Sequence, residues 1–145
     1  MLNNKSLKDF KRIKDAQAWL FENTDKEMQP PWKMSHTRHP CTIWTAETVS
    51  NYYWHLDLAE SLLREYTRRY KKHHKSEPVI EWLRENIPVN IKNESLTEFP
   101  QCVPDDCKVL GDAPAAYKKY YIGYKNHFAK WEPRAQTPKW YSEAF

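Results

Sequence analysis

The chain has 145 residues, the length of one domain that can bury a core without disulfides. Two glycines against ten prolines exclude Gly-rich phosphate loops and disfavour a sheet with many tight turns. The net charge is +4, but residues 64–75 hold six Lys or Arg and one Glu, so this segment carries +5 and the rest carries −1. Such concentrated positive charge indicates an anionic partner.

The cysteine content favours a reducing compartment, and the hydropathy pattern disfavours a membrane-spanning segment. The start MLNNKSLKDF lacks the apolar core of a signal peptide, and no run of about eighteen apolar residues occurs. Three cysteines are too few for a disulfide scaffold. We therefore expect a cytoplasmic protein with free thiols and no membrane span.

The first half of the chain predicts two helices. An amphipathic pattern indicates a helix from about residue 6 to 22, followed by a Pro-rich link, so residues 1–37 form one N-terminal unit. Thr45 reads as the N-cap of a long central helix, residues 45–70, in which apolar positions recur three or four residues apart. This stripe assigns Tyr66 and Tyr70 to the core.

The second half predicts two more helices separated by a long loop. Ser76 and Pro78 begin a short helix that ends near residue 86, and residues 88–111 form a loop pinned by apolar side chains. Asp112 caps a helix that continues to Trp131, and residues 132–145 follow as an extended arm. The prediction is an all-α single domain, residues 1–145, of about four helices with long, aromatic-pinned loops.

The C-terminal end of the central helix carries more positive charge than helix capping requires. One or two cations suffice to stabilise a helix dipole. Two interpretations stay open: a solvated charged face, or phosphate contact with aromatic stacking, as suits single-stranded or flipped bases. The expected nucleic-acid contacts are Arg64, Arg68, Arg69, Lys72, His74 and Lys75, with Trp44 and Trp54 as stacking candidates.

A metal site is a further alternative. The candidate ligands are His36, His39, Cys41, Cys102 and Cys107. Zinc sites usually pair cysteines at closer spacing, such as Cys-x2-Cys, so the sequence favours neither a metal nor any other cofactor.

The sequence offers two kinds of candidate catalytic side chain, carboxylates and a thiol. Carboxylate candidates for acid–base chemistry are Glu22, Glu27 and Glu47, although most acids on an amphipathic helix are surface residues. Cys41 near His39 offers a thiol and a base, in a spacing that matches no nucleophile pattern.

Four strings, in order, resemble a small family of mostly uncharacterised phage and bacterial proteins. They are HPCTIW, SNYYWHLDLAESLLREYTRRYKKHHKSEPVIEWL, LTEFPQCVPDD and AAYKKYYIGYKNHFAKWEPRAQTPKW, and the resemblance covers roughly 70% of the chain. That family is similar in turn to pyrimidine-dimer DNA glycosylases of the phage endonuclease V type. The shared outline includes an HP-containing link, a long helix with a basic end, and a tail like Pro138-Lys139-Trp140-Tyr141.

The second resemblance implies a compact all-α enzyme of a bacterial host cell that flips a base and forms a Schiff base through its N-terminal amine. The sequence departs from this pattern on the catalytic side. Leu2 would leave Met1 in place, whereas these enzymes expose a small residue after Met removal. The assisting glutamate would be Glu22 or Glu27, and neither lies in a matching motif.

Three functions remain open on the sequence. The first is a phage-type DNA-interacting protein related to a base-excision glycosylase, with or without lyase activity. The second is a non-catalytic regulatory module that docks a host or phage protein through exposed aromatic residues. The third is an enzyme that acts on a small molecule in a cleft between the central helix and the loop at 88–111, with a zinc variant of that activity.

Overall fold

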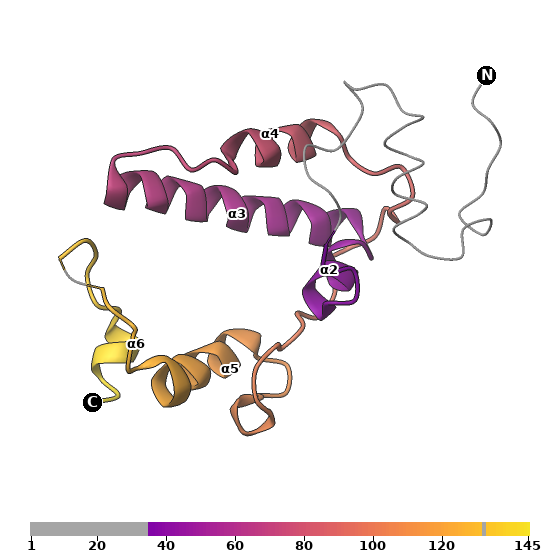
Figure 1. Cartoon of the computed structure of the whole chain (residues 1–145). Helices are drawn as coiled ribbons and strands as arrows, with labels where there is room; N and C mark the ends of the chain where they lie inside the picture. Colours follow the sequence, from indigo (N-terminus) through magenta and orange to yellow (C-terminus); the bar gives the residue numbers. More distant parts are fainter. Residues whose placement is uncertain (1–34, 132) are drawn as a thin grey trace, which may run out of the picture.

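The computed structural model describes residues 35–131 and 133–145 (Figure 1). These residues form five α-helices and no β-strand, so the predicted all-α fold is confirmed. The helices are α2 (Pro40–Thr45), α3 (Val49–Tyr70), α4 (Glu77–Glu85), α5 (Ala113–Tyr120) and α6 (Lys139–Ser142). The predicted helix at about 6–22 lies outside the described residues. None of the described helices has the length and apolar character needed to cross a membrane.

The central helix begins later than predicted, because a separate short helix precedes it. Pro40 occupies the first turn of α2, and Thr45 ends this helix with its hydroxyl donating to the Cys41 carbonyl at 2.6 Å. The N-cap of α3 is Thr48, whose side chain accepts from the Asn51 N–H at 3.1 Å. Thr45 is therefore not the N-cap, and the chain bends between α2 and α3.

Helices α3 and α4 form an antiparallel hairpin (Figure 1). The Tyr52 hydroxyl donates to the Leu83 carbonyl at 2.6 Å, joining the start of α3 to the end of α4. The guanidinium of Arg84 reaches back to Glu60 at 2.5 Å and to Asp57 at 2.6 Å. The predicted bounds of α4 are confirmed, with Ser76 as N-cap and Asn86 as C-cap.

Asn51 fixes the long loop against α3. This side chain is fully buried; its Nδ2 donates to the Trp44 carbonyl and to the Thr97 hydroxyl, and its Oδ1 accepts from the Thr97 N–H. Phe99 then packs on Trp44, with ring centroids 5.2 Å apart. The loop is thus pinned by a buried amide as well as by the predicted apolar side chains.

The C-terminal third is less regular than predicted. Asp112 caps α5 through a bond from the Ala115 N–H at 2.9 Å, as expected, but α-helical geometry ends at Tyr120. A π-helical turn follows at Tyr121–Lys125, and Gly123 within it has low helix propensity. The arm predicted as extended from 132 to 145 contains α6, which begins directly after Pro138.

Candidate functional site

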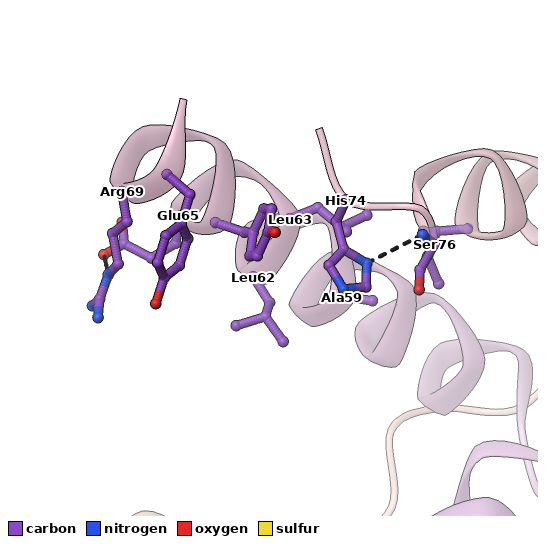
Figure 2. Close-up of a pocket in the computed structure, with 10 residues that line it drawn as sticks. Ala59, Leu62, Leu63, Glu65, Arg69, His74 and Ser76 are labelled. Carbon is purple, nitrogen blue, oxygen red and sulfur yellow. Dashed lines mark hydrogen bonds and ion pairs between the residues drawn. The ribbon is translucent and has the colours of Figure 1, made fainter. Parts of the chain in front are cut away.

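A groove of about 440 Å³ runs along the α3–α4 hairpin toward its connecting segment (Figure 2). Apolar side chains of both helices line most of it, and charged and aromatic groups line the end beside residues 64–75, which we name the basic elbow. The lining residues are Ala59, Leu62, Leu63, Glu65, Tyr66, Arg69, Tyr70, His74, Ser76 and Ile80. The groove lies within the size range of about 300–1,000 Å³ typical of ligand sites.

Three neighbouring rings form a wall at this end of the groove. The Tyr66 and Tyr70 ring centroids lie 4.8 Å apart, and His74 meets Tyr66 edge-on at 4.9 Å. His74 is held by its Nδ1, which accepts from the Ser76 N–H at 3.1 Å (Figure 2). Tyr66 is half-buried and Tyr70 is 45% exposed, so their prediction as core residues is wrong.

The Tyr70 ring also contacts the C-terminal segment. The Arg134 guanidinium carbon lies 5.0 Å from the ring centroid, a distance typical of a cation–π contact. This contact brings a cation from a segment 64 residues later to the end of α3. The hydrophobic periodicity of α3 cannot predict this contact, because Arg134 lies outside that helix.

Two of the predicted phosphate ligands share one carboxylate. Arg68 donates to both oxygens of Glu65 at 2.7 and 2.6 Å, and Arg69 donates to one of them at 2.5 Å. These hydrogen bonds lower the pKa of Glu65 to about 2, so this carboxylate is ionised at any physiological pH. Glu65 therefore neutralises part of the charge that the sequence assigned to Arg68 and Arg69.

The lysines of the basic elbow are free of such pairing within the part of the chain that the structure describes. Lys71, Lys72 and Lys75 are exposed, and none of them forms an ion pair with another described residue. Lys71 is the C-cap of α3, with a left-handed φ of 54° that turns the chain sharply toward α4. The three lysines thus lie in the segment that connects α3 to α4, at a corner of the chain (Figure 1).

Arg64 lies farther from this corner than the lysines. Its guanidinium is 3.9 Å from Glu60, one turn earlier on α3, and donates to the Ser61 hydroxyl at 2.9 Å. At 70% side-chain exposure, such a long contact is weak and solvent-screened. Arg64 thus stays available as an outer phosphate contact.

The two tryptophans predicted to stack on bases lie away from the basic elbow, Trp44 in α2 and Trp54 near the start of α3. Sixteen residues separate Trp54 from Tyr70, a helical rise of about 24 Å. Trp44 is only 5% exposed and packs against Trp54 and Phe99, with centroids 5.6 and 5.2 Å away. Trp44 is therefore a core residue, and Trp54 alone of the pair is exposed enough to contact a ligand.

These rings line a second, smaller pocket of about 240 Å³ between α2, α3, the long loop and α5. Its walls are almost entirely apolar, and His55 is one of its few polar groups. The ring of His55 bonds Thr45 Oγ1 at 2.6 Å, and burial lowers the pKa of His55. The imidazole is consequently neutral at pH 7.

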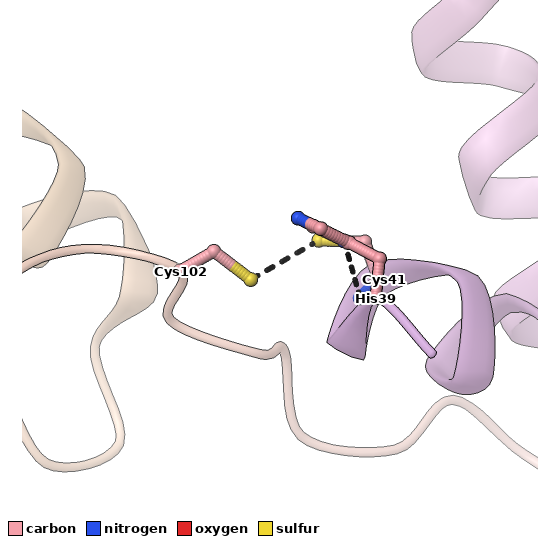
Figure 3. A group of neighbouring side chains, drawn as sticks. All are labelled: His39, Cys41 and Cys102. Carbon is pink, nitrogen blue, oxygen red and sulfur yellow. Dashed lines mark hydrogen bonds between the residues drawn. The ribbon is translucent and has the colours of Figure 1, made fainter. Parts of the chain in front are cut away.

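Three of the five predicted metal ligands come together beside this pocket (Figure 3). The ligand atoms of His39, Cys41 and Cys102 all lie within 4.8 Å of one another. Burial and the neighbouring Cys102 thiol raise the pKa of Cys41 to about 11. His36 is exposed and bonds Ser35, and Cys107 is buried in the turn before α5, so neither belongs to the cluster.

The predicted acids do not form a catalytic pair in the described residues. Glu47 lies in the turn between α2 and α3, where it accepts from the Thr97 hydroxyl at 3.2 Å. This contact supports the loop. Glu47 precedes the start of α3, whereas the basic elbow is at the other end of that helix. Glu22 and Glu27 lie outside the described residues.

Comparison with known proteins adds no functional assignment. No protein-family model, curated protein sequence or solved structure matches this chain. Any function therefore has to be inferred from the geometry of the groove and of the thiol cluster.

Proposed function

We propose that the protein binds nucleic acid at the groove and the basic elbow, with an unstacked base in the groove and phosphates at the corner. The observation that carries this proposal is the placement of the Tyr66–Tyr70 pair next to three exposed lysines without ion-pair partners among the described residues. Proteins that bind single strands combine a cationic path for the backbone with aromatic faces for the bases.

Electrostatics supports phosphate contact at the elbow. Each phosphate that a lysine neutralises releases condensed counterions, so a cluster of ammonium groups gives affinity that falls with salt. Among the described residues, Lys71, Lys72 and Lys75 have no carboxylate to displace, whereas Arg68 and Arg69 must first leave Glu65. We therefore assign the first phosphate contacts to the lysines and a secondary role to the arginines.

The groove favours a base that is out of a duplex. Its apolar side chains, including Leu63 and Ile80, accommodate the flat face and edge of a base but offer few polar partners to a paired one. Stacking of one base on an aromatic ring contributes about 1–3 kcal/mol. Single-stranded DNA, or duplex DNA with an extruded base, is the expected ligand.

The resemblance to pyrimidine-dimer DNA glycosylases agrees with this ligand class and extends the proposal to base-excision chemistry. Such an enzyme would form an imine between an amine of the protein and the sugar of an abasic site. Borohydride reduction of the protein mixed with abasic-site DNA distinguishes lyase activity from DNA binding alone. A covalent adduct identifies a lyase and its amine, whereas binding without an adduct identifies a binding protein.

Fluorescence anisotropy of the full chain with labelled single-stranded and duplex DNA tests the binding proposal. Replacing Lys71, Lys72 and Lys75 together by Ala is expected to weaken single-strand binding roughly 30-fold or more at low salt, and to flatten the salt dependence by about two to three units of slope. Lys118, Lys119 and Lys130 provide a control of equal charge, because they are exposed and belong to α5 and the segment after it. Equal affinities for the two triple variants would contradict the assignment of the site.

A further inference from the structure

Two segments 61 residues apart bring a pair of thiols into contact (Figure 3). Cys41 Sγ and Cys102 Sγ are 3.5 Å apart, and a ring nitrogen of His39 completes a triangle whose atoms all lie within 4.8 Å. The triangle is half-buried at the two cysteines and exposed at the histidine. It belongs to neither the groove nor the basic elbow.

The local structure holds each member of this triangle in place. His39 is the N-cap of α2, and its Nδ1 accepts from the Cys41 N–H at 3.2 Å. Cys41 follows Pro40 in the first turn of the same helix. Cys102 lies on the long loop, where its N–H donates to the Tyr117 hydroxyl of α5 at 3.2 Å. The cluster therefore joins α2, the loop and α5.

We propose that His39, Cys41 and Cys102 bind one zinc ion, with a fourth position filled by water or another small ligand. The two thiols lose their protons to solvent as the two Zn–S bonds form, and a lone pair of the neutral imidazole supplies the third bond. Two thiols and one imidazole match the preference of Zn²⁺ for sulfur and nitrogen donors. Three protein ligands plus an open position is the arrangement of zinc sites that bind an exchangeable ligand.

The separation of the two sulfurs is closer to that of two zinc-bound thiolates than to that of a disulfide. Zn–S bonds of about 2.3 Å in a tetrahedron place two thiolates roughly 3.8 Å apart, close to the 3.5 Å separation of these sulfurs. A disulfide requires about 2.05 Å between them. A neutral imidazole offers one nitrogen lone pair, so zinc coordination by His39 exchanges the capping bond to Cys41 for a metal bond.

The proposed zinc site lies beside the second, apolar pocket. Cys41 lines the aromatic pocket of about 240 Å³ together with Trp54, Phe99 and Tyr117. A metal ion on Cys41 would therefore lie at the border between a polar cluster and an apolar cavity. A ligand with a zinc-binding group, such as a carboxylate or thiol, and an apolar body has the chemistry to fill both.

Titration of the reduced, metal-free full chain with Co²⁺ and then Zn²⁺ tests the proposal. Cobalt is expected to bind at one equivalent with a thiolate-to-metal charge-transfer absorption and the intense visible bands of a tetrahedral site, and zinc is expected to displace it. Zinc should also raise the melting temperature, because it binds the folded chain at a site assembled from distant segments.

Single substitutions locate the metal. Cys41→Ser and Cys102→Ser are each expected to remove the charge-transfer absorption or reduce its intensity by about half, and His39→Ala to weaken cobalt binding at least tenfold. His36→Ala and Cys107→Ala are the matched controls, since these residues lie outside the cluster, and both should bind as the parent does. Circular dichroism of the metal-free variants establishes that each retains its helices.

Three results would overturn the proposal. The first is a reduced parent protein that binds no cobalt at micromolar concentration, and the second is equal loss of binding in the control variants. The third is a charge-transfer absorption that keeps the intensity of the parent protein in both cysteine variants. If the reduced protein binds no metal but Cys41 and Cys102 cross-link on oxidation, the pair is a redox couple and not a zinc site. DNA binding plays no part in these measurements, so its failure leaves them unaffected.

Discussion

At the scale of single residues, Glu65 decides how much of the positive charge at the end of α3 is available to a ligand. One carboxylate holds both Arg68 and Arg69 by hydrogen bonds of 2.5–2.7 Å. The same two arginines are central to the nucleic-acid site that the sequence predicts. Charge arithmetic along the chain counts Glu65 as one unit among seven, whereas the geometry shows that it occupies the donors of two cations at once.

Replacing Glu65 with Gln is therefore expected to strengthen nucleic-acid binding. The change removes the negative charge that pairs with two guanidinium groups, so the net charge at the groove rises by one and affinity for a single strand should rise roughly two- to tenfold at low salt. Anisotropy titrations measure the change. Glu81→Gln on α4 is the control, because it changes the net charge equally at an exposed position outside the groove lining. Weaker binding by Glu65→Gln than by this control would show that the ion pairs organise the site rather than mask it.

At the scale of elements, the junction of α2, α3 and the long loop depends on one buried amide. Asn51 makes three hydrogen bonds, to the Trp44 carbonyl and to the hydroxyl and N–H of Thr97. The loop carries Phe99 and Cys102, so the same amide supports one wall of the aromatic pocket and one ligand of the proposed zinc site. Its loss would leave the part-buried Thr97 N–H without its partner, whereas the Trp44 carbonyl would keep the bond from the Glu47 N–H.

We expect Asn51→Ala to lower the free energy of unfolding by about 2–4 kcal/mol, since three hydrogen bonds and the packing of a fully buried side chain are lost together. Ser50→Ala is the neighbouring control. The Ser50 hydroxyl makes a single, solvent-exposed hydrogen bond, to the Glu94 carbonyl at 2.9 Å. The loss of this bond should lower the free energy of unfolding by less than about 1 kcal/mol. Urea unfolding followed by circular dichroism compares the two. Similar free energies for both variants would mean that the loop is held mainly by its apolar side chains.

At the scale of the whole molecule, local signals predict the helices, but contacts between segments decide the sites. Asp112 is predictable as a cap because its side chain accepts from the Ala115 N–H within one turn, and Ser76 because Pro78 follows it in the first turn of α4. The apolar stripe of α3 correctly predicts a helix, but it wrongly predicts that the last turn of this helix is buried. Burial depends on what packs against the stripe, and the contacts of α4 through Leu83 and Arg84 lie on the first and middle turns of α3.

The candidate sites divide in the same way. The sequence predicts the basic elbow because charges adjacent in the chain remain adjacent in space. It cannot select His39, Cys41 and Cys102 from five candidate ligands, because two distant segments have to meet before the set exists. Nor can it show that Tyr66 and Tyr70 face a groove, or that Arg134 approaches them from the C-terminal segment.

Photo-cross-linking of the full chain to a single-stranded oligonucleotide that contains 5-bromouracil tests the central claim most directly. Peptide mass spectrometry then locates each cross-link. The groove at the basic elbow predicts cross-links at Tyr66, Tyr70 or His74, suppressed by excess unlabelled strand and by replacement of Lys71, Lys72 and Lys75 with Ala. Cross-links confined to Trp54 and Phe99 at the far end of α3, or cross-links that persist in the lysine variant, would contradict it.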